Sequence, residues 1–341
     1  MPLRVFREAP PEAAELDLEA FLAWLGEPAL FHLTGASQDR CRVLCGGLHG
    51  NEPSGFHAIH RLLADPPPLP CDALLFLGNV PAALHDIPFT HRFLPGQEDM
   101  NRVWRSPGGS VLRALAREVL DALEALPCEA FVDLHNNSGH NPIYGVLLDR
   151  DPRCVALGRH WTRRFVVYGG QDLGTFLEQT RGRAPGVVIE CGQAGDPDAD
   201  ARALAGARAY LSAEDPFSVA EPAEPVQAYL SVARIHVPAE VDLAFAEERT
   251  VADLTVSPRI DRYNFCRMEP GTRLAWRNER GRLVVLGNDG REVTDDYLEA
   301  RDGGIYLRRA ITPVMMTTDA LAARADCLLY AAEPLEDLAD S

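Results

Sequence analysis

The sequence contains no lysine, and all 33 of its basic residues are arginines, set against 50 acidic residues. The formal net charge of the 341-residue chain is therefore -17. Such an acidic surface repels nucleic acid and anionic membranes, so we expect neither as a main partner. A small anionic substrate stays compatible with this charge, because a few arginines inside a cleft can reverse the local field.

Long apolar runs are also missing. No stretch approaches the roughly 20 apolar residues of a transmembrane helix, and the first 25 residues contain no run that suits a signal peptide. The eight cysteines form no C-x-x-C pair, and most lie inside apolar runs. We therefore expect free, buried thiols and a cytoplasmic protein.

Helical and strand-like patterns alternate along the first part of the chain, which predicts an α/β layered fold. The segment 80–110 is irregular and rich in proline, glycine and histidine. Helices are predicted at 16–25, 53–63, 111–126 and 199–213, and strands at 41–46, 73–77, 130–134, 143–148 and 186–190.

The composition changes at 218–225 (SVAEPAEP), which we interpret as a linker. We predict a first domain at 1–217 and a smaller, mostly β C-terminal domain at 226–341. Short β-like runs follow the linker, separated by turn signals, at 226–237, 273–276, 282–286 and 305–308.

A candidate metal site begins in GGLHGNEPSG, residues 46–55, where a buried strand gives way to a glycine-rich turn and a helix. His49 and Glu52 lie three residues apart, so both can bind one ion from the same side. Catalytic zinc sites commonly combine two histidines with one glutamate and leave a position open for water. The pair alone is weak, because ten histidines and many acids make chance matches common.

His135 is the candidate third ligand, because it ends the predicted strand AFVDL and sites in open α/β sheets lie at the carboxyl ends of strands. Asp133 points to the same side of that strand. It is either a partner that orients a ligand or a buried structural acid. His85, His91 and His140 lie in loops and have no clear role.

Two further segments carry chemistry. Asn101 and Arg102, in EDMNRVW, place an amide beside a guanidinium, a combination suited to a carboxylate. Glu190 closes the apolar strand GVVIE, where a carboxylate is costly unless it has a partner or a task. It is a candidate general base, or a structural acid paired with Arg181 or Arg183.

These segments together resemble the succinylglutamate desuccinylase/aspartoacylase family of the zinc carboxypeptidase clan. The resemblance rests on four motifs in order within residues 46–193: Gly-x-His-Gly-Asn-Glu, Asp-Met-Asn-Arg, Asp-Leu-His-Asn and Ile-Glu-Cys-Gly. It implies a zinc-carboxypeptidase-like mixed sheet with helices on both faces. It also implies that the β-rich C-terminal domain narrows the active-site cleft.

The resemblance also implies residue roles. Arg92 matches an arginine that helps to polarise the scissile carbonyl, and Glu190 matches a residue acting as general base and then general acid. Arg181 stands near the place of a further carboxylate-binding arginine, with Arg183 as competitor. One Zn²⁺ per chain is implied, with His49, Glu52 and His135 as ligands and with Asn101 and Arg102 binding the substrate carboxylate.

Two departures concern the substrate. The segment 311–326 lacks the C-terminal tyrosine with which aspartoacylases contact their substrate, and the loop 135–145 has a sequence of its own. We expect a zinc-dependent amidohydrolase acting on a small, anionic N-acyl amino acid. The alternatives are a carboxypeptidase-like enzyme for short peptides and a metal- or ligand-binding protein without catalysis. The sequence leaves open whether the chain forms a homo-oligomer.

Overall fold

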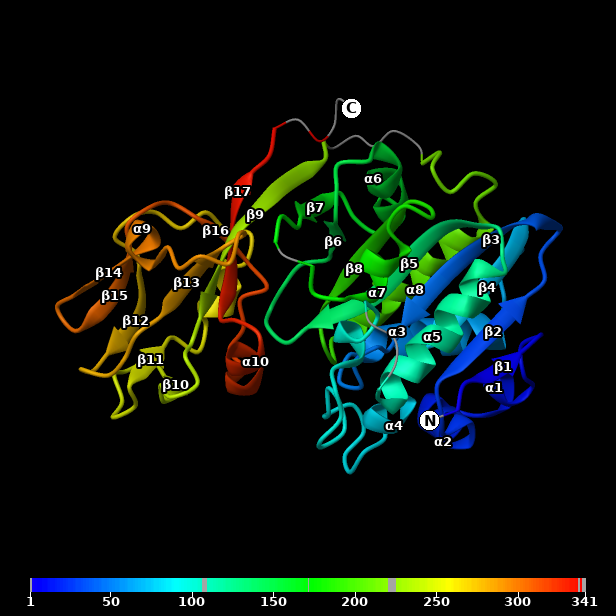
Figure 1. Ribbon diagram of the computed structural model, residues 1–341, viewed down its shortest axis with the longest axis horizontal. Coiled ribbons are helices and arrows are strands. Elements are labelled where there is room, and N and C mark those ends of the chain that lie inside the picture. Colours follow the sequence, from blue (N-terminus) through cyan, green and yellow to red (C-terminus); the bar gives the residue numbers. More distant parts are fainter. Residues whose placement is uncertain (1, 106–108, 171, 220–224, 337, 339–341) are drawn as a thin grey trace.

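The computed structural model describes residues 2–105, 109–170, 172–219, 225–336 and 338, and these form two sheets (Figure 1). The larger sheet is 12-stranded and mixed. Its strands, in spatial order, are β1 (Arg4–Phe6), β2 (Ala29–Leu33), β4 (Cys71–Leu77), β3 (Ser37–Gly46), β5 (Cys128–Asn137), β8 (Gly186–Gln193), β6 (Tyr144–Leu147), β7 (Arg164–Val167), β9 (Gln227–His236), β17 (Leu329–Pro334) and β16 (Thr312–Val314), with β13 (Val284–Gly287) paired to β9.

The smaller, 5-stranded sheet belongs to the C-terminal part, so the mostly β character predicted there is confirmed. Its order is β10 (Leu243–Phe245), β11 (Leu254–Val256), β12 (Arg273–Arg277), β15 (Gly304–Leu307) and β14 (Leu298–Arg301). The helices are α1 (Glu12–Glu15), α2 (Leu18–Leu25), α3 (Pro53–Ala64), α4 (Val80–Ala83), α5 (Val111–Glu124), α6 (Pro152–Gly158), α7 (Phe176–Thr180), α8 (Pro197–Ser212), α9 (Thr294–Tyr297) and α10 (Ala320–Ala325), with 3-10 turns η1 (Met100–Arg102) and η2 (Ile260–Tyr263).

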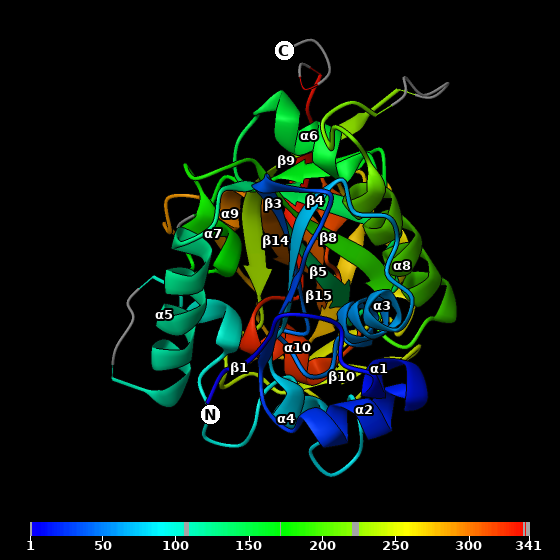
Figure 2. The ribbon, with the colours of Figure 1, turned by 90° about the vertical axis from the view of Figure 1, so that its right-hand side faces the viewer.

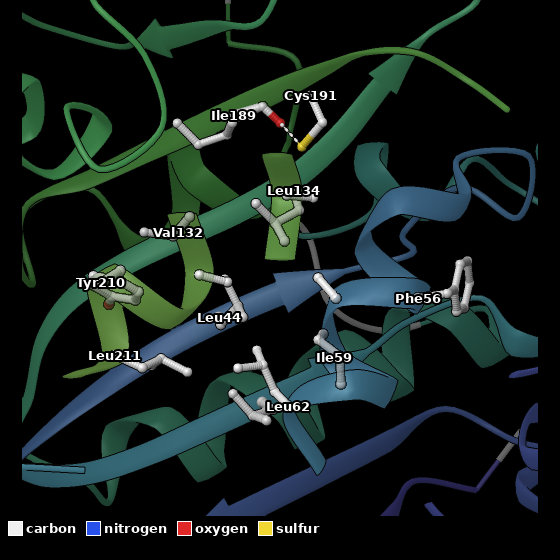
Figure 3. Close-up of a cluster of buried hydrophobic side chains, with 14 of the residues drawn as sticks. Leu44, Phe56, Ile59, Leu62, Val132, Leu134, Ile189, Cys191, Tyr210 and Leu211 are labelled. Atoms are coloured by element: carbon white, nitrogen blue, oxygen red, sulfur yellow. Dashed lines mark hydrogen bonds between the residues drawn. The ribbon is translucent and has the colours of Figure 1, made fainter. Parts of the chain in front are cut away.

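Helices cover both faces of the larger sheet, as predicted. Figure 2 shows α5 and α7 on one side and α3 and α8 on the other. The central strands are covered on both faces, so their buried parts contain continuous apolar runs, such as VLC in β3 and ALLFL in β4, instead of alternating with polar residues. On the α3 and α8 side, Leu44, Val132 and Ile189 pack against Ile59 and Tyr210 (Figure 3).

The sheet continues through the point where we predicted a domain boundary. The strands β9, β13, β16 and β17 come from the C-terminal half, yet they extend the sheet of the N-terminal half. The smaller sheet packs around a second apolar cluster, taken from residues between 233 and 331, which it shares with β9, β13 and β17 of the larger sheet. Most of the predicted linker, 220–224, lies outside the described residues, and the boundaries 1–217 and 226–341 stay predictions.

The cysteines and the helix lengths agree with two expectations from the sequence. The eight cysteines are free, and six of them are buried. Among the described residues, every helix is too short or too polar to span a bilayer.

One buried charge ties the sheet to α8. Arg42 on β3 has a side chain that is 1% exposed. It donates to Glu129 Oε1 at 2.7 Å and to the carbonyls of Tyr210 at 2.8 Å and Ala213 at 2.5 Å, at the C-terminal end of α8. A cation suits a helix C-terminus, because the last carbonyls have no partner within the helix.

We expect Arg42→Met to lower the free energy of unfolding by about 1–3 kcal/mol, because it leaves the carbonyls at the end of α8 without their donor and removes one of the two arginines beside the part-buried Glu129. The matched control is Arg40→Met on the same strand. Arg40 is 3.3 Å from the same Glu129, but its side chain is 38% exposed, so about 0–1 kcal/mol is expected. Denaturant unfolding of both variants measures the difference, and equal losses would show that the buried fork has no special role.

Candidate active site

The turn between β3 and α3 brings His49 and Glu52 to the carboxyl end of the sheet. Gly47 has a φ of 69°, and a Cβ there would lie 2.3 Å from the Phe56 ring, so only glycine fits the turn. Glu52 occupies the N-cap of α3, but its side chain makes no capping hydrogen bond. Its carboxylate faces two imidazoles instead.

His49, Glu52 and His135 form one buried cluster. Nδ1 of His49 lies 2.8 Å from Glu52 Oε1, and Nδ1 of His135 lies 2.7 Å from Glu52 Oε2. One ligand atom from each residue lies within 4.8 Å of the others, a spacing from which three side chains can hold a metal ion. Two imidazoles and a carboxylate are a common donor set for catalytic zinc, so the residues present fit this ion.

Two aspartates contact the imidazoles at Nε2, on the side of each ring that faces away from Glu52. Nε2 of His49 lies 2.9 Å from Asp99 Oδ1, and Nε2 of His135 lies 3.0 Å from Asp133 Oδ2. A carboxylate at Nε2 accepts a hydrogen bond from the ring there, so Nδ1 of each ring is the atom that faces Glu52 and would bind a metal ion. Carboxylates in this position fix the tautomer and the orientation of metal-binding histidines. Asp133 was already a candidate for this role from the sequence, whereas Asp99 was noted only as the first residue of the motif Asp-Met-Asn-Arg and was given no role.

The charged groups of the cluster shift one another's pKa values strongly. Although burial opposes its ionisation, His49 and His135 hold the pKa of Glu52 well below its usual range. Burial likewise disfavours the charged form of His135, but Asp133 and Glu52 raise its pKa well above the ordinary value. Glu52 is therefore an ionised carboxylate at the centre of the cluster, which suits a metal ligand.

Arg92 reaches this cluster from the loop after α4. Its Nε lies 3.0 Å from Asp99 Oδ2, and its Nη1 lies 3.4 Å from Glu52 Oε1. Burial works against its charge, but Asp99, Glu52 and, more weakly, Asp326 of the C-terminal part raise its pKa above the ordinary value. The side chain keeps 34% of its surface exposed, so part of the guanidinium is available to a ligand.

Asn101 and Arg102 lie in the turn η1 beside the cluster. Phe176 at the start of α7 donates its backbone N–H to Asn101 Oδ1 at 2.9 Å, which turns the Asn101 amide nitrogen toward His135 Nε2, at 3.4 Å. Since Asp133 takes the proton of that ring nitrogen, the Asn101 amide can donate elsewhere. Arg102 donates to the carbonyl of Asn101 at 2.8 Å, and no carboxylate of the described residues forms an ion pair with it.

Glu190 lies on β8, directly beside His135 on β5. It is buried, and Asn137 donates its amide Nδ2 to Oε2 at 2.6 Å. Burial raises the pKa of Glu190 to about 8, which suits a group that takes and returns a proton near neutral pH. Cys191 points to the opposite face and packs in the core near Leu134 (Figure 3).

Tyr144 on β6 is a further residue next to the site that the sequence did not single out. It stands opposite Glu190 in the antiparallel pair of β6 and β8, so both side chains lie on one face of the sheet. The residue is completely buried, and its hydroxyl has no hydrogen-bond partner among the described residues. The only signal in the sequence is a tyrosine inside a short apolar strand.

The C-terminal part adds side chains next to this face. Tyr330 on β17 shares a buried cluster with Tyr144. The Tyr330 ring lies 6.3 Å from that of Tyr168 and 6.0 Å from the Arg234 guanidinium. The segment 311–326 has no tyrosine, but Tyr330, four residues after it, lies in the same buried cluster as Tyr144.

The loop that follows β5 is attached to the C-terminal part. Ser138 Oγ lies 2.8 Å from Thr317 Oγ1, and the backbone N–H of His140 donates to Asp261 Oδ2 at 3.0 Å. Asn264 donates its side-chain amide to the carbonyl of His140 at 3.0 Å. The position of the loop after His135 therefore depends on residues far along the chain, which explains why its sequence was uninformative.

Arg181 is the one predicted site residue that the structure does not bring to the cluster. It caps α7 and forms an ion pair with Asp149 at 3.5 Å. It lines a cavity of about 430 Å³ with Cys128 and Gly186, which begin β5 and β8, whereas the cluster lies at the other end of these strands. Arg183 pairs with Glu124 at 2.6 Å.

Comparison with known proteins points to one family. A family model described as the succinylglutamate desuccinylase/aspartoacylase catalytic domain matches residues 39–212. This range contains every predicted site residue.

Solved structures match the fold over most of the chain. Murine aminoacylase 3 is 18% identical with a TM-score of 0.60, and the match covers 89% of this chain and 97% of that chain. A succinylglutamate desuccinylase/aspartoacylase from Rhodobacter sphaeroides is 16% identical with a TM-score of 0.59 (89% and 88% covered). A product-bound ectoine utilization protein from Ruegeria pomeroyi is 15% identical with a TM-score of 0.60 (89% and 88% covered). At these identities the likeness concerns the fold, including the C-terminal part beyond residue 212.

Proposed function

The chain belongs to the succinylglutamate desuccinylase/aspartoacylase family, and from this we propose that it is a zinc-dependent deacylase of small N-acyl amino acids. Membership supports deacylation of an N-acyl amino acid at the level of the family. The observation that carries the proposal is the convergence of His49 and His135, each held by its own aspartate, on Glu52. Zinc bound there would polarise the amide carbonyl and acidify a water molecule.

The chain's own residues take the remaining roles. Asn101 and Arg102 hold the free carboxylate of the substrate, which sets the amide against the metal cluster. Arg92 donates to the carbonyl oxygen as negative charge develops on it. Glu190 accepts the proton of the attacking water and passes it to the leaving amine, with Asn137 fixing its orientation. Arg181 is left out, because it is paired at the opposite end of the strands.

We further propose that the C-terminal part narrows the cleft and so favours small substrates. Three observations support this role. The loop after His135 is hydrogen-bonded to Thr317 and Asp261, Asp326 raises the pKa of Arg92, and Tyr330 packs in the cluster of Tyr144. We expect a wall of this kind to favour an amino acid with its acyl group over a folded polypeptide.

The test is a panel of N-acetyl, N-succinyl and longer N-acyl amino acids, with short peptides alongside, given to the zinc-loaded protein. We expect hydrolysis of at least one N-acyl amino acid, loss of activity with a chelator and recovery on adding Zn²⁺. Cleavage of peptides alone would favour the carboxypeptidase alternative. A zinc-loaded, folded protein without any hydrolysis would favour a binding protein.

The role of Arg102 can be tested on any active substrate. Arg102→Lys keeps the charge but loses the planar fork that binds a carboxylate through two hydrogen bonds. We expect KM to rise by roughly 10- to 100-fold, the equivalent of a charged hydrogen bond, with zinc content unchanged.

Arg105→Lys is the matched control for this variant. Arg105 lies in the same segment, its side chain is 65% exposed and it pairs with Asp172 at 3.7 Å. Its KM should stay at the wild-type value. An Arg102→Lys protein with wild-type kinetics on every substrate would remove Arg102 from the substrate site.

A further inference from the structure

A second group of metal-binding side chains lies outside the active-site cluster, in the loop after α4. His85, Asp86 and His91 each offer one ligand atom, and these atoms all lie within 4.8 Å of one another. His85 Nε2 is 3.5 Å from Asp86 Oδ2, and the two imidazole rings are 4.7 Å apart. All three side chains keep contact with solvent. The proposed deacylase mechanism uses none of them.

The tautomer of His91 follows from its hydrogen bonds. Thr90 donates its single hydroxyl hydrogen to the carbonyl of Ile87 at 2.7 Å. The same hydroxyl oxygen lies 3.0 Å from His91 Nδ1. It has no further hydrogen to give, so Nδ1 of His91 must donate and its Nε2 carries the free lone pair. A histidine fixed in this way resembles the metal ligands of other proteins, whose second nitrogen is bound by a neighbouring acceptor.

The backbone of the loop brings the two histidines together. Asp86 and Phe89 adopt left-handed φ angles of 53° and 59°, which are unusual for side chains of this size. The N–H of Phe89 donates to the carbonyl of Ala83 at 2.7 Å, which closes the loop back on α4. The Phe89 ring packs 5.9 Å from that of Phe56 on α3. These contacts hold the chain in a reversal that places His91 beside His85.

We propose that His85, Asp86 and His91 form a second metal site, which binds Zn²⁺ or a similar transition-metal cation with water as the remaining ligand. Two imidazoles and a carboxylate favour such ions over Mg²⁺ and Ca²⁺, which prefer oxygen ligands alone. The site is open to solvent, so its ion exchanges more readily than one in the buried cluster.

The site is joined to the active site through the backbone. His91 precedes Arg92, and the carbonyl of Arg92 accepts a hydrogen bond from the N–H of Gly50 at 3.0 Å. Gly50 in turn follows His49. An ion that joins His91 to His85 therefore restrains the backbone of Arg92 and the turn of the first metal cluster. The second ion acts as a clamp on the loop that carries Arg92.

The experiment starts from the protein loaded with one equivalent of Zn²⁺, to which further Zn²⁺ or Co²⁺ is added in a calorimeter. We expect a second, weaker equivalent in the wild type, and its loss in both His85→Ala and His91→Ala while the first equivalent is kept. His140→Ala, which removes an exposed imidazole from another loop, should keep both. Conversely, His49→Ala should lose the tight equivalent and keep the weaker one, which separates this site from the proposed catalytic one.

Hydrogen exchange of the Gly50 amide tests the clamp. Exchange should slow when the second equivalent binds to the wild type, and should not respond in His91→Ala. A wild type that binds only one equivalent, or a second equivalent that persists in both loop variants, would overturn the site. Binding without slower exchange at Gly50 would overturn the clamp. Melting curves of both variants verify that they are folded, which is expected because the loop is exposed.

Discussion

His49→Ala should purify with little or no zinc in the tight site and should have no measurable deacylase activity. His49 and His135 face Glu52 with their Nδ1 atoms, so removing one imidazole leaves two ligands where at least three are needed. We expect the metal affinity to fall by more than about 100-fold, since loss of an orienting residue alone costs about 10- to 100-fold.

Two further variants grade this effect. Asp99→Asn keeps the ligands but weakens the acceptor at His49 Nε2, 2.9 Å away, so an affinity loss of about 10- to 100-fold is expected. His57→Ala is the matched control, because His57 lies on α3, whose N-cap is Glu52, with a 42% exposed side chain that pairs with Asp200 and is not a ligand. Elemental analysis after dialysis against a chelator of known affinity ranks the zinc affinities of the three variants. Full zinc occupancy in His49→Ala would show that the cluster is not the metal site.

The local elements could largely be predicted from the sequence. The patterns predicted helices at 53–63 and 111–126, and the structure has α3 (Pro53–Ala64) and α5 (Val111–Glu124). Pro53 at the first helical position and the strong periodicity of 111–126 explain these successes. Some strands were drawn too short: β8 runs to Gln193, beyond Glu190, because Gln193 pairs with Asn137 on β5 after a shift of register.

What escaped prediction depends on contacts between distant residues. β7, with four residues, and β17, with six, carry too little pattern to stand out, yet they join the two halves of the chain into one sheet through β9. No local signal marks such pairing, because a strand's partner is set by the tertiary fold. The sequence therefore predicted a second, mostly β domain, but not that some of its strands extend the first sheet.

The site shows the same division. The sequence predicted His49, Glu52 and His135, and the structure brings them together, because the turn after β3 and the end of the neighbouring strand β5 meet at one edge of the sheet. Asp99 and Tyr144 were missed, since their importance comes only from which side chains they face. Arg181 was proposed only from the family resemblance, and in the structure α7 ends there and the side chain pairs with Asp149.

Glu190→Gln should lower kcat by roughly 10²- to 10⁴-fold, the usual contribution of general acid–base catalysis. The amide keeps the shape of the side chain, and its oxygen can still accept from Asn137 Nδ2, but it cannot accept a proton. Zinc should stay bound, because Glu190 is not part of the metal cluster. KM should change little, because Asn101 and Arg102 are untouched.

The rival explanation is that Glu190 is a structural acid, and the structure weakens it, because Arg181 and Arg183 pair with Asp149 and Glu124 instead. Glu178→Gln is the matched control: this carboxylate completes the capping box of α7, so its loss should lower the melting temperature while kcat stays normal. The measurement is kcat per zinc-loaded, folded molecule, with a melting curve for each variant. A Glu190→Gln protein that behaves like Glu178→Gln, melting earlier but turning over normally, would place Glu190 outside the chemistry. A large fall in kcat at an unchanged melting temperature would place the proton transfer at Glu190, since nothing else in the site has been altered.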